Sequence, residues 1–280
     1  MHPLYTYIKQ SLVDIYPESE TSALARWILT DVFCLSTTDL YTGKDTDFSK
    51  NEHERLEDIL SRLKRYEPLQ YILGKTTFCG FPFEVRPGVL IPRPETEELV
   101  EWIVQDWEGE NEICILDVGT GSGCIPITLA RKLCKAQVIS WDVSEEALAV
   151  ARRNSVLNGV KVALERVDVL DDRLPEIQVN VLVSNPPYIT LKERAEMERN
   201  VLDWEPEIAL FVSDDDPLLF YRRIAEVGLD ILVDEGALYF EINRAYGKET
   251  VVLLEQMGYR QVELRKDLSG NDRMIKALKP

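Results

Sequence analysis

Apolar and polar positions follow two different spacings along this chain, and the change between them divides it into regions. Over residues 1–74 apolar side chains recur every three or four positions, which is typical of amphipathic helices. The polar stretch 36–51 interrupts that pattern and indicates a loop with one short turn of helix. From residue 76 to 93 short apolar segments alternate with glycine and proline, as in a β-hairpin. We therefore expect a helical bundle over 1–74 and a β-hairpin linker over 75–93.

Beyond the linker, residues 94–280 alternate between short apolar runs and amphipathic segments. Helices are predicted to begin at Pro94 and to cover 124–132, 144–157, 217–233 and 246–257. Strands are predicted over 113–118, 136–141, 161–167, 181–184, 237–242, 260–264 and 273–278. The alternation predicts an α/β fold with a mostly parallel sheet of about seven strands, helices on both faces and an antiparallel last strand. The polar residues 191–200 indicate a helix or a lid.

A glycine-rich turn follows the first strand of this region and reads Gly119-Thr120-Gly121-Ser122-Gly123. Glycines let a backbone approach a ligand where a side chain would collide. Asp142 ends the next strand, about 20 residues later, where a carboxylate can accept from the two hydroxyls of a ribose. Asp168 and Val169 end the third strand, where an adenine edge fits. The pattern predicts a cofactor with an adenosine portion, and Cys124 disfavours nicotinamide because the dinucleotide pattern usually has glycine there.

The apolar run 181–184 ends in a second candidate site, Asn185-Pro186-Pro187-Tyr188. Neither proline can donate a sheet hydrogen bond, so the chain leaves the sheet as a rigid loop at the edge where ligands bind. The Asn185 amide oxygen and a backbone carbonyl can together accept both hydrogens of one planar NH2 group. Tyr188 can stack on the same flat group. This pattern favours the orientation of an amide or an exocyclic amine, and a plain turn after a strand is the alternative.

Composition and charge narrow the classes of function. The 280 residues carry 49 acidic and 32 basic side chains, and the formal net charge of −17 disfavours stable nucleic-acid binding. Only His2 and His53 are available for histidine-dependent catalysis. The five cysteines contain no Cys-x-x-Cys pair, so we expect no metal site and a reducing compartment. No apolar run approaches the roughly 18 residues of a membrane span, so we expect a cytoplasmic protein without membrane association.

Three stretches in this order and spacing, 117–123, Asp142 and 185–188, resemble those of class I S-adenosylmethionine-dependent methyltransferases that methylate amino groups. Either motif alone is weak, whereas the two together are specific. Two flanking stretches narrow the resemblance. Residues 67–74, Glu-Pro-Leu-Gln-Tyr-Ile-Leu-Gly, and 91–97, Ile-Pro-Arg-Pro-Glu-Thr-Glu, are similar to those of the bacterial peptide chain release factor glutamine methyltransferases. The resemblance covers nearly the whole chain.

This resemblance implies a Rossmann-like fold and the use of S-adenosyl-L-methionine to methylate a glutamine side-chain amide. The implied substrate is the Gly-Gly-Gln motif of class I peptide chain release factors. As a separate hypothesis, we expect residues 1–74 and the hairpin to contact the release factor, and we expect a monomer. The implied cofactor residues are Gly119, Thr120, Gly121, Ser122 and Gly123 for the methionine part, Asp142 for the ribose, and Asp168 and Val169 for the adenine, with Asn185 adjoining. Family members often carry a large aromatic residue at the position of Val169.

The resemblance also implies roles for the second candidate site. Asn185 and the Pro186 carbonyl are implied to receive the two amide hydrogens of the substrate glutamine. Tyr188 is implied to pack on the plane of that amide, and Pro187 to complete the substrate site. Arg93, between two prolines at the predicted domain junction, either guards a ligand pocket or caps local structure.

Three other functions stay open at this point. DNA adenine amino-methyltransferases use the same loop, but they need a basic channel for a flipped base, and this chain is acidic. A non-catalytic cofactor-binding or ribosome-interaction protein is the second alternative. A nicotinamide oxidoreductase is the third.

Overall fold

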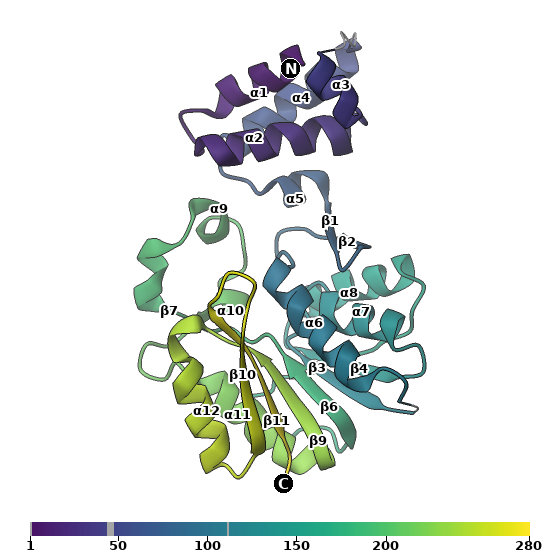
Figure 1. Cartoon of the computed structure of the whole chain (residues 1–280), viewed down its shortest axis with the longest axis vertical. Helices are drawn as coiled ribbons and strands as arrows, with labels where there is room; N and C mark the ends of the chain where they lie inside the picture. The colour runs from purple at the N-terminus through teal and green to yellow at the C-terminus, as the bar shows by residue number, and fades with distance from the viewer. Residues whose placement is uncertain (1, 44–47, 111) are drawn as a thin grey trace. The chain divides into compact units, whose positions relative to one another are not determined.

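The computed structural model describes residues 2–43, 48–110 and 112–280 (Figure 1). These residues form two compact units. One comprises the chain up to Leu73 together with Arg199–Trp204, and the other comprises Gly74–Glu198 and Glu205–Pro280. Within the described residues, every helix is too short or too polar to cross a membrane.

The first unit is helical, as its apolar spacing predicts. Its elements are α1 (Pro3–Leu12), α2 (Glu18–Trp27), the π-helix η1 (Ile28–Val32), α3 (Thr37–Thr42), α4 (Lys50–Leu63), α5 (Leu69–Leu73) and α9 (Arg199–Leu202). The α4 helix begins where it does because Ser49 and Glu52 each bond to the other's backbone N–H. Its side chains Leu56 and Leu60 are buried against Ile8 of α1. The predicted loop over 36–51 contains α3, and its residues 44–47 lie outside the described residues.

A short segment from late in the sequence, Arg199–Trp204, belongs to this helical unit. The Trp204 Nε1 donates to the Arg65 carbonyl at 3.1 Å. The Arg199 guanidinium lies 4.2 Å from the ring centroid of Tyr66, a cation–π distance. The region predicted as a helix or lid is therefore split between the 3₁₀-helix η2 (Leu191–Glu196) and α9.

The second unit is built on a seven-stranded sheet. Its strands in spatial order are β10 (Arg260–Lys266), β11 (Asp272–Leu278), β9 (Leu232–Glu241), β6 (Val179–Ser184), β3 (Cys114–Val118), β4 (Gln137–Asp142) and β5 (Ala163–Arg166). The last five are mutually parallel, and β11 runs antiparallel to both of its neighbours. The predicted α/β fold, strand number and antiparallel final strand are confirmed.

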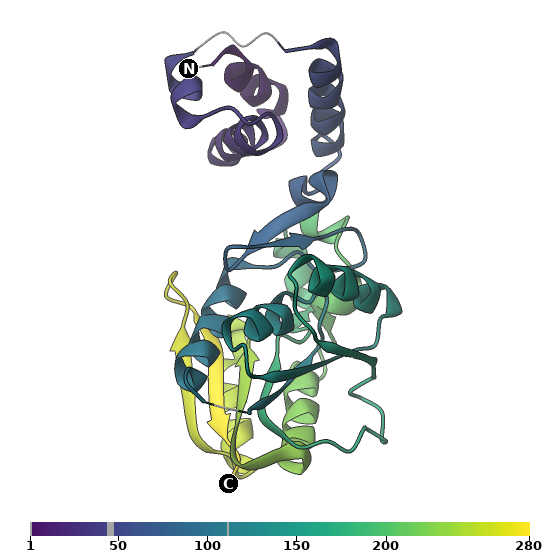
Figure 2. The ribbon, with the colours of Figure 1, turned by 90° about the vertical axis from the view of Figure 1, so that its right-hand side faces the viewer.

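Helices cover both faces of this sheet because consecutive strand residues point to opposite sides (Figure 2). On β3, Ile115 packs with α6 (Pro94–Trp107) and α7 (Cys124–Lys132). Its neighbour Leu116 packs with α11 (Leu219–Ile231) and α12 (Gly247–Gln256). The same unit contains α8 (Glu145–Leu157), α10 (Glu207–Leu210), the 3₁₀-helix η3 (Arg244–Tyr246) and the short parallel pair β7 (Ile189–Thr190) and β8 (Phe211–Val212).

The hairpin is shorter than the stretch 75–93 in which we expected it. It consists of β1 (Lys75–Phe78) and β2 (Phe81–Glu84). Residues 85–93 form no strand, and Val89 instead closes a turn onto the Arg86 carbonyl. Prolines within 85–93 remove backbone donors that a ladder needs. The hairpin is tied to α8 by the buried Asn154, which bonds both the N–H and the carbonyl of Glu84.

Gly228 on α11 offers a test of the packing between this helix and the sheet. A Cβ at Gly228 would collide with the Tyr259 hydroxyl, which donates to the Ala225 carbonyl at 2.8 Å, and would press on Leu182. We expect Gly228→Ala to lower the free energy of unfolding by about 2 kcal/mol in urea titrations. Tyr259→Phe should cost about 1 kcal/mol alone and should lessen the effect of Gly228→Ala, because the clashing oxygen is gone. Additive effects of the two substitutions would contradict this packing.

Candidate active site

A cavity of about 260 Å³ lies at the carboxyl ends of the parallel strands, the edge where such sheets bind ligands. Most of the predicted site residues line it: Gly119, Thr120, Gly121, Ser122, Asp142, Asp168, Val169, Asn185, Pro186 and Pro187. Gly123 and Tyr188 are not among the lining residues. The fold therefore brings the two candidate motifs, which begin 66 residues apart in sequence, onto one cavity.

The glycine loop has a backbone that other residues rarely adopt. Gly119, Gly121 and Gly123 have φ values of +84°, +53° and +83°, all in the left-handed region. Gly123 also packs closely, since a Cβ there would collide with Ile127 on α7. The loop is held from below by Asn154, whose Nδ2 donates to the Ser122 carbonyl at 2.8 Å. Gly123 therefore packs against helices α7 and α8 and does not line the cavity.

Asp142 also stabilises the glycine loop. Its Oδ2 accepts from the Gly121 N–H at 2.9 Å, and its Oδ1 accepts from the Ser144 N–H at 2.8 Å. Burial raises the pKa of Asp142, and these two backbone hydrogen bonds oppose that rise. Each carboxylate oxygen can accept more than one hydrogen bond. Asp142 can therefore hold the loop and still accept from ribose hydroxyls.

The cavity walls suit an adenosine cofactor chemically. The carboxylate of Asp142 provides acceptors for hydroxyl groups, and glycine backbone replaces side chains where the methionine part would lie. Apolar side chains able to cover a flat base line the same cavity: Leu90, Val169, Ile208, Phe220 and Ile224. Phe220 supplies an aromatic ring in this wall, beside the smaller side chain of Val169.

Asn185 is the polar side chain of the second motif in the cavity wall. Its Nδ2 donates to the Thr96 hydroxyl at 3.3 Å. The Asn185 Oδ1 is then the acceptor that the side chain retains for a ligand. Thr96 lies on the first turn of α6, next to Arg93, which also lines the cavity.

Tyr188 is fixed at both its backbone and its hydroxyl. The hydroxyl donates to Glu241 Oε1 at 3.0 Å, and the Tyr188 carbonyl accepts from Asn243 Nδ2 at 3.0 Å. Burial raises the pKa of Tyr188 well above its ordinary value, so the ring carries a neutral donor. The predicted stacking of Tyr188 on a substrate amide stays a prediction.

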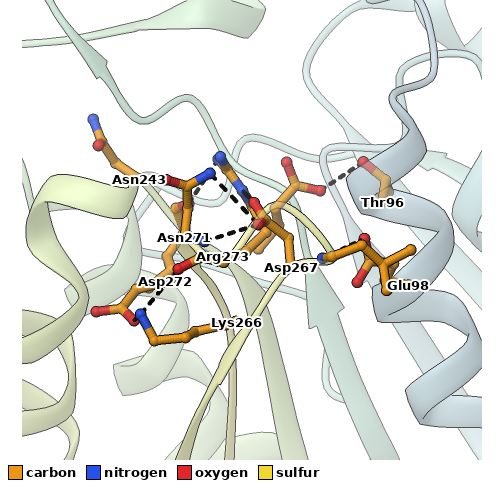
Figure 3. A network of polar contacts seen from close by, with 12 residues as sticks. Thr96, Glu98, Asn243, Lys266, Asp267, Asn271, Asp272 and Arg273 are labelled. Carbon is orange, nitrogen blue, oxygen red and sulfur yellow. Dashed lines mark hydrogen bonds and ion pairs between the residues drawn. The ribbon is translucent and has the colours of Figure 1, made fainter.

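Three polar residues at the site escaped the sequence-based prediction: Thr96, Glu205 and Glu241. Thr96 donates to Glu241 Oε2 at 2.5 Å, and Figure 3 shows Thr96 and Glu98 on α6 facing the polar cluster around Arg273 and Asp267. Glu205 binds the Arg93 guanidinium at 2.6 Å and the Ile91 N–H at 3.1 Å, so Arg93 is anchored at the cavity wall. Glu241 could have been noticed in the sequence, because it is the one acidic residue in the apolar run 237–242. A carboxyl group buried in such a strand needs hydrogen-bond partners.

Known families match this chain in two places. A model described as the PrmC N-terminal domain matches residues 4–74, and one described as the methyltransferase small domain matches residues 96–203. The release factor glutamine methyltransferase of Bacteroides thetaiotaomicron is 50% identical over 278 residues, which cover 99% of each chain. That of Flavobacterium psychrophilum is 45% identical, covering 97% of this chain and 96% of the relative. The chain belongs to the release factor glutamine methyltransferase family.

Solved structures agree with this family assignment at the level of the fold. A methyltransferase from Pyrococcus furiosus superposes with a TM-score of 0.54 at 17% identity, covering 82% of this chain and 99% of the other. The 16S rRNA N2 G1207 methyltransferase of Thermus thermophilus, solved with AdoMet and guanosine, gives 0.54 at 19% identity, covering 74% of this chain and 50% of the other. The Rossmann-like fold of the class I methyltransferases, expected from the motifs, is thereby confirmed for this release factor glutamine methyltransferase family member.

The buried Asp117 beneath the glycine loop makes a prediction about pH. Burial raises the pKa of Asp117 to about 7, although hydroxyl groups of Ser140 and Thr120 lower it. The folded chain then keeps a proton that the unfolded chain releases near the ordinary value of 3.8. Stability from this group is full below that value and is lost as pH rises toward about 7.

We expect Asp117→Asn, which cannot titrate, to reduce the loss of stability with rising pH. Between pH 3.8 and about 7, its free energy of unfolding in urea should fall less than that of the wild type, by on the order of 2 kcal/mol. The exposed Asp172→Asn is the matched control and should keep the wild-type pH dependence. An unchanged pH profile in Asp117→Asn would show that this carboxyl is already ionised in the folded chain.

Proposed function

We propose that this protein transfers a methyl group from S-adenosyl-L-methionine to the side-chain amide nitrogen of glutamine in the Gly-Gly-Gln motif of class I peptide chain release factors. The observation that carries the proposal is the placing of Asn185 on the same cavity as the glycine loop and Asp142. Relatives that are 45% and 50% identical over nearly the whole chain bear the name release factor glutamine methyltransferase. That name supports glutamine as the acceptor and a release factor as the protein substrate.

The chemistry of a glutamine amide as the methyl acceptor supports a catalytic role for asparagine and requires no histidine. An amide nitrogen is a poor nucleophile because its lone pair is delocalised into the carbonyl. Acceptors on both of its hydrogens raise the electron density on nitrogen and fix its direction. The Asn185 Oδ1 and the Pro186 carbonyl are the proposed pair. Tyr188 is proposed to pack beside the amide plane, and Pro187 to stiffen the loop.

Different residues of the cavity are proposed to bind different parts of the cofactor. Gly119–Gly123 would hold the methionine part, Asp142 the ribose, and Asp168 with Val169 the adenine. When bound, the cofactor supplies an electrophilic methyl group on a sulfonium. No strong base is needed before transfer, because methylation of the neutral amide nitrogen gives a positively charged amide, which is a strong acid and afterwards loses its proton to solvent. The chain's part is alignment and exclusion of water from the nitrogen.

Protein recognition is proposed to involve the helical region 1–74 and the hairpin. The helical region matches its own family model, separate from the one that matches the methyltransferase domain. We propose that the enzyme is monomeric and cytoplasmic. We also propose that it forms no stable complex with nucleic acid, because its net charge of −17 repels phosphate groups.

Deleting residues 1–74 should lower kcat/KM for a release factor at least about 100-fold, while the Kd for the cofactor in calorimetry stays within about threefold. Equal losses of both would contradict a recognition role.

Asn185→Ala tests the catalytic assignment. We expect a fall in kcat of about 10²- to 10³-fold, because an acceptor that aligns the nitrogen is lost. The Kd for the cofactor should change little. The measurement is the gain of one methyl group on the motif glutamine, followed by mass spectrometry of release factor peptides.

The matched control is Gln178→Ala, which removes an exposed carboxamide from the same unit. Duplex DNA offered beside the release factor tests the adenine alternative, and label found in DNA alone would refute the proposed substrate. A non-catalytic role would instead leave the biological function intact in Asn185→Ala. Binding of NADH without binding of S-adenosylmethionine would point to an oxidoreductase.

A further inference from the structure

Four polar groups from three separate parts of the chain form one hydrogen-bonded series at the cavity. Asn185 Nδ2 donates to Thr96 Oγ1 at 3.3 Å, and Thr96 Oγ1 donates to Glu241 Oε2 at 2.5 Å. The second oxygen of Glu241 accepts from the Tyr188 hydroxyl at 3.0 Å. Thr96 and Glu241 are 2% and 1% exposed. Asn185 and Tyr188 are the two ends of the proposed catalytic loop, so hydrogen bonds of this series fix the loop at both ends.

The direction of these hydrogen bonds follows from counting protons. A carboxylate accepts and cannot donate, and a threonine hydroxyl has one proton. Thr96 gives that proton to Glu241, at a distance typical of a charge-assisted bond. The Thr96 oxygen can then only accept from Asn185. The atom of the Asn185 amide that faces Thr96 must therefore be nitrogen, which leaves Oδ1 for the substrate.

Both oxygens of Glu241 accept a hydroxyl hydrogen, the arrangement expected for a carboxylate. Burial raises the pKa of Glu241 and the charge of Glu95 adds to that rise, while the hydroxyl groups of Thr96 and Tyr188 and the positive charge of Arg273 oppose it. Arg273 is itself held by Asp267, through an Nε–Oδ2 distance of 3.1 Å, in the cluster that Figure 3 shows. The ion pair with Asp267 thus holds Arg273 near the buried Glu241.

We infer that Thr96 and Glu241 are positioning residues for methyl transfer, which set the orientation of the Asn185 carboxamide so that its oxygen receives the substrate amide. This inference rests on the proposed function. Both are inferred to act through Asn185, because the Thr96 hydroxyl is bonded to Glu241 and Asn185 and Glu241 is not among the residues that line the cavity. An amide can rotate by 180° with almost no change in shape, so packing alone does not select the orientation that catalysis needs. The Thr96 oxygen selects it, because its proton is given to Glu241 and it can only accept from Asn185.

Glu241→Gln tests the direction of the series. A glutamine at 241 can donate its amide hydrogen to Thr96, which frees the Thr96 proton to donate to Asn185 Oδ1. The Asn185 amide would then turn and present its NH2 group to the substrate. We expect kcat to fall about 10- to 100-fold, with KM for the release factor and Kd for the cofactor within about threefold of the wild type.

Thr96→Val and Thr96→Ser separate the hydroxyl from the shape of the side chain. Thr96→Val keeps the shape and should lower kcat about 10- to 100-fold with the same small effect on KM. Thr96→Ser keeps the hydroxyl and should retain kcat within about threefold. Thr250→Val is the matched control, because it removes another buried hydroxyl, one that bonds the carbonyl of Tyr246, the residue just before α12. It should leave kcat unchanged.

A spectroscopic measurement makes the test independent of turnover. In protein labelled with ¹⁵N-asparagine, the side-chain NH2 signals of Asn185 should shift in Thr96→Val and stay in place in Thr250→Val. The inference is overturned if Thr96→Val turns over like the wild type, or if Thr96→Ser is as slow as Thr96→Val. It is also overturned if the Asn185 signals are the same in both valine variants. A wild type that leaves glutamine unmethylated would refute the proposed function, while the spectra would still test the series.

Discussion

The parallel pairing of β3 with β6 is the constraint on which the site depends. Its register sets Val118 beside Ser184, the last residue of each strand. The Ser184 hydroxyl donates to the Val118 carbonyl at 2.6 Å, and both residues are buried. Gly119 and Asn185 therefore leave the sheet side by side, and a Cβ on Gly119 would lie 3.9 Å from the Asn185 carbonyl oxygen. A register shift of one residue would reverse the faces of β6 and separate the cofactor loop from the acceptor loop.

Around that pairing, hydrogen bonds from distant parts of the chain remove the remaining freedom of the two loops. In the glycine loop, Asp142 accepts from the Gly121 N–H and Asn154 donates to the Ser122 carbonyl. Thr96, Glu241 and Asn243 hold the loop that carries Asn185. Such groups cost no reorganisation at the moment of reaction, and they act in a buried setting where hydrogen bonds are stronger than in water. Alignment by fixed acceptors suits an amide nitrogen, which no side chain of this cavity needs to deprotonate first.

The sequence predicted the parts of the molecule that depend on local pattern. The order of strands and helices over 94–280 followed from apolar periodicity, and the cavity residues followed from motifs that sit at strand ends. Longer-range contacts were not predictable in this way. Thr96 lies on the buried face of a helix, where its spacing suggests only packing, and its partner Glu241 is 145 residues away. The segment Arg199–Trp204 joins the helical unit through contacts that no local pattern encodes.

The central claim is that the Asn185 oxygen and the Pro186 carbonyl hold a glutamine amide with its nitrogen facing the methyl donor. The most direct test is a crystal structure of the complex between this protein, the demethylated cofactor product and a release factor. We expect the glutamine nitrogen within about 2.7–3.2 Å of both oxygens, with its free side toward the cofactor sulfur. A glutamine outside the cavity, or one whose carbonyl oxygen faces the sulfur, would contradict the account.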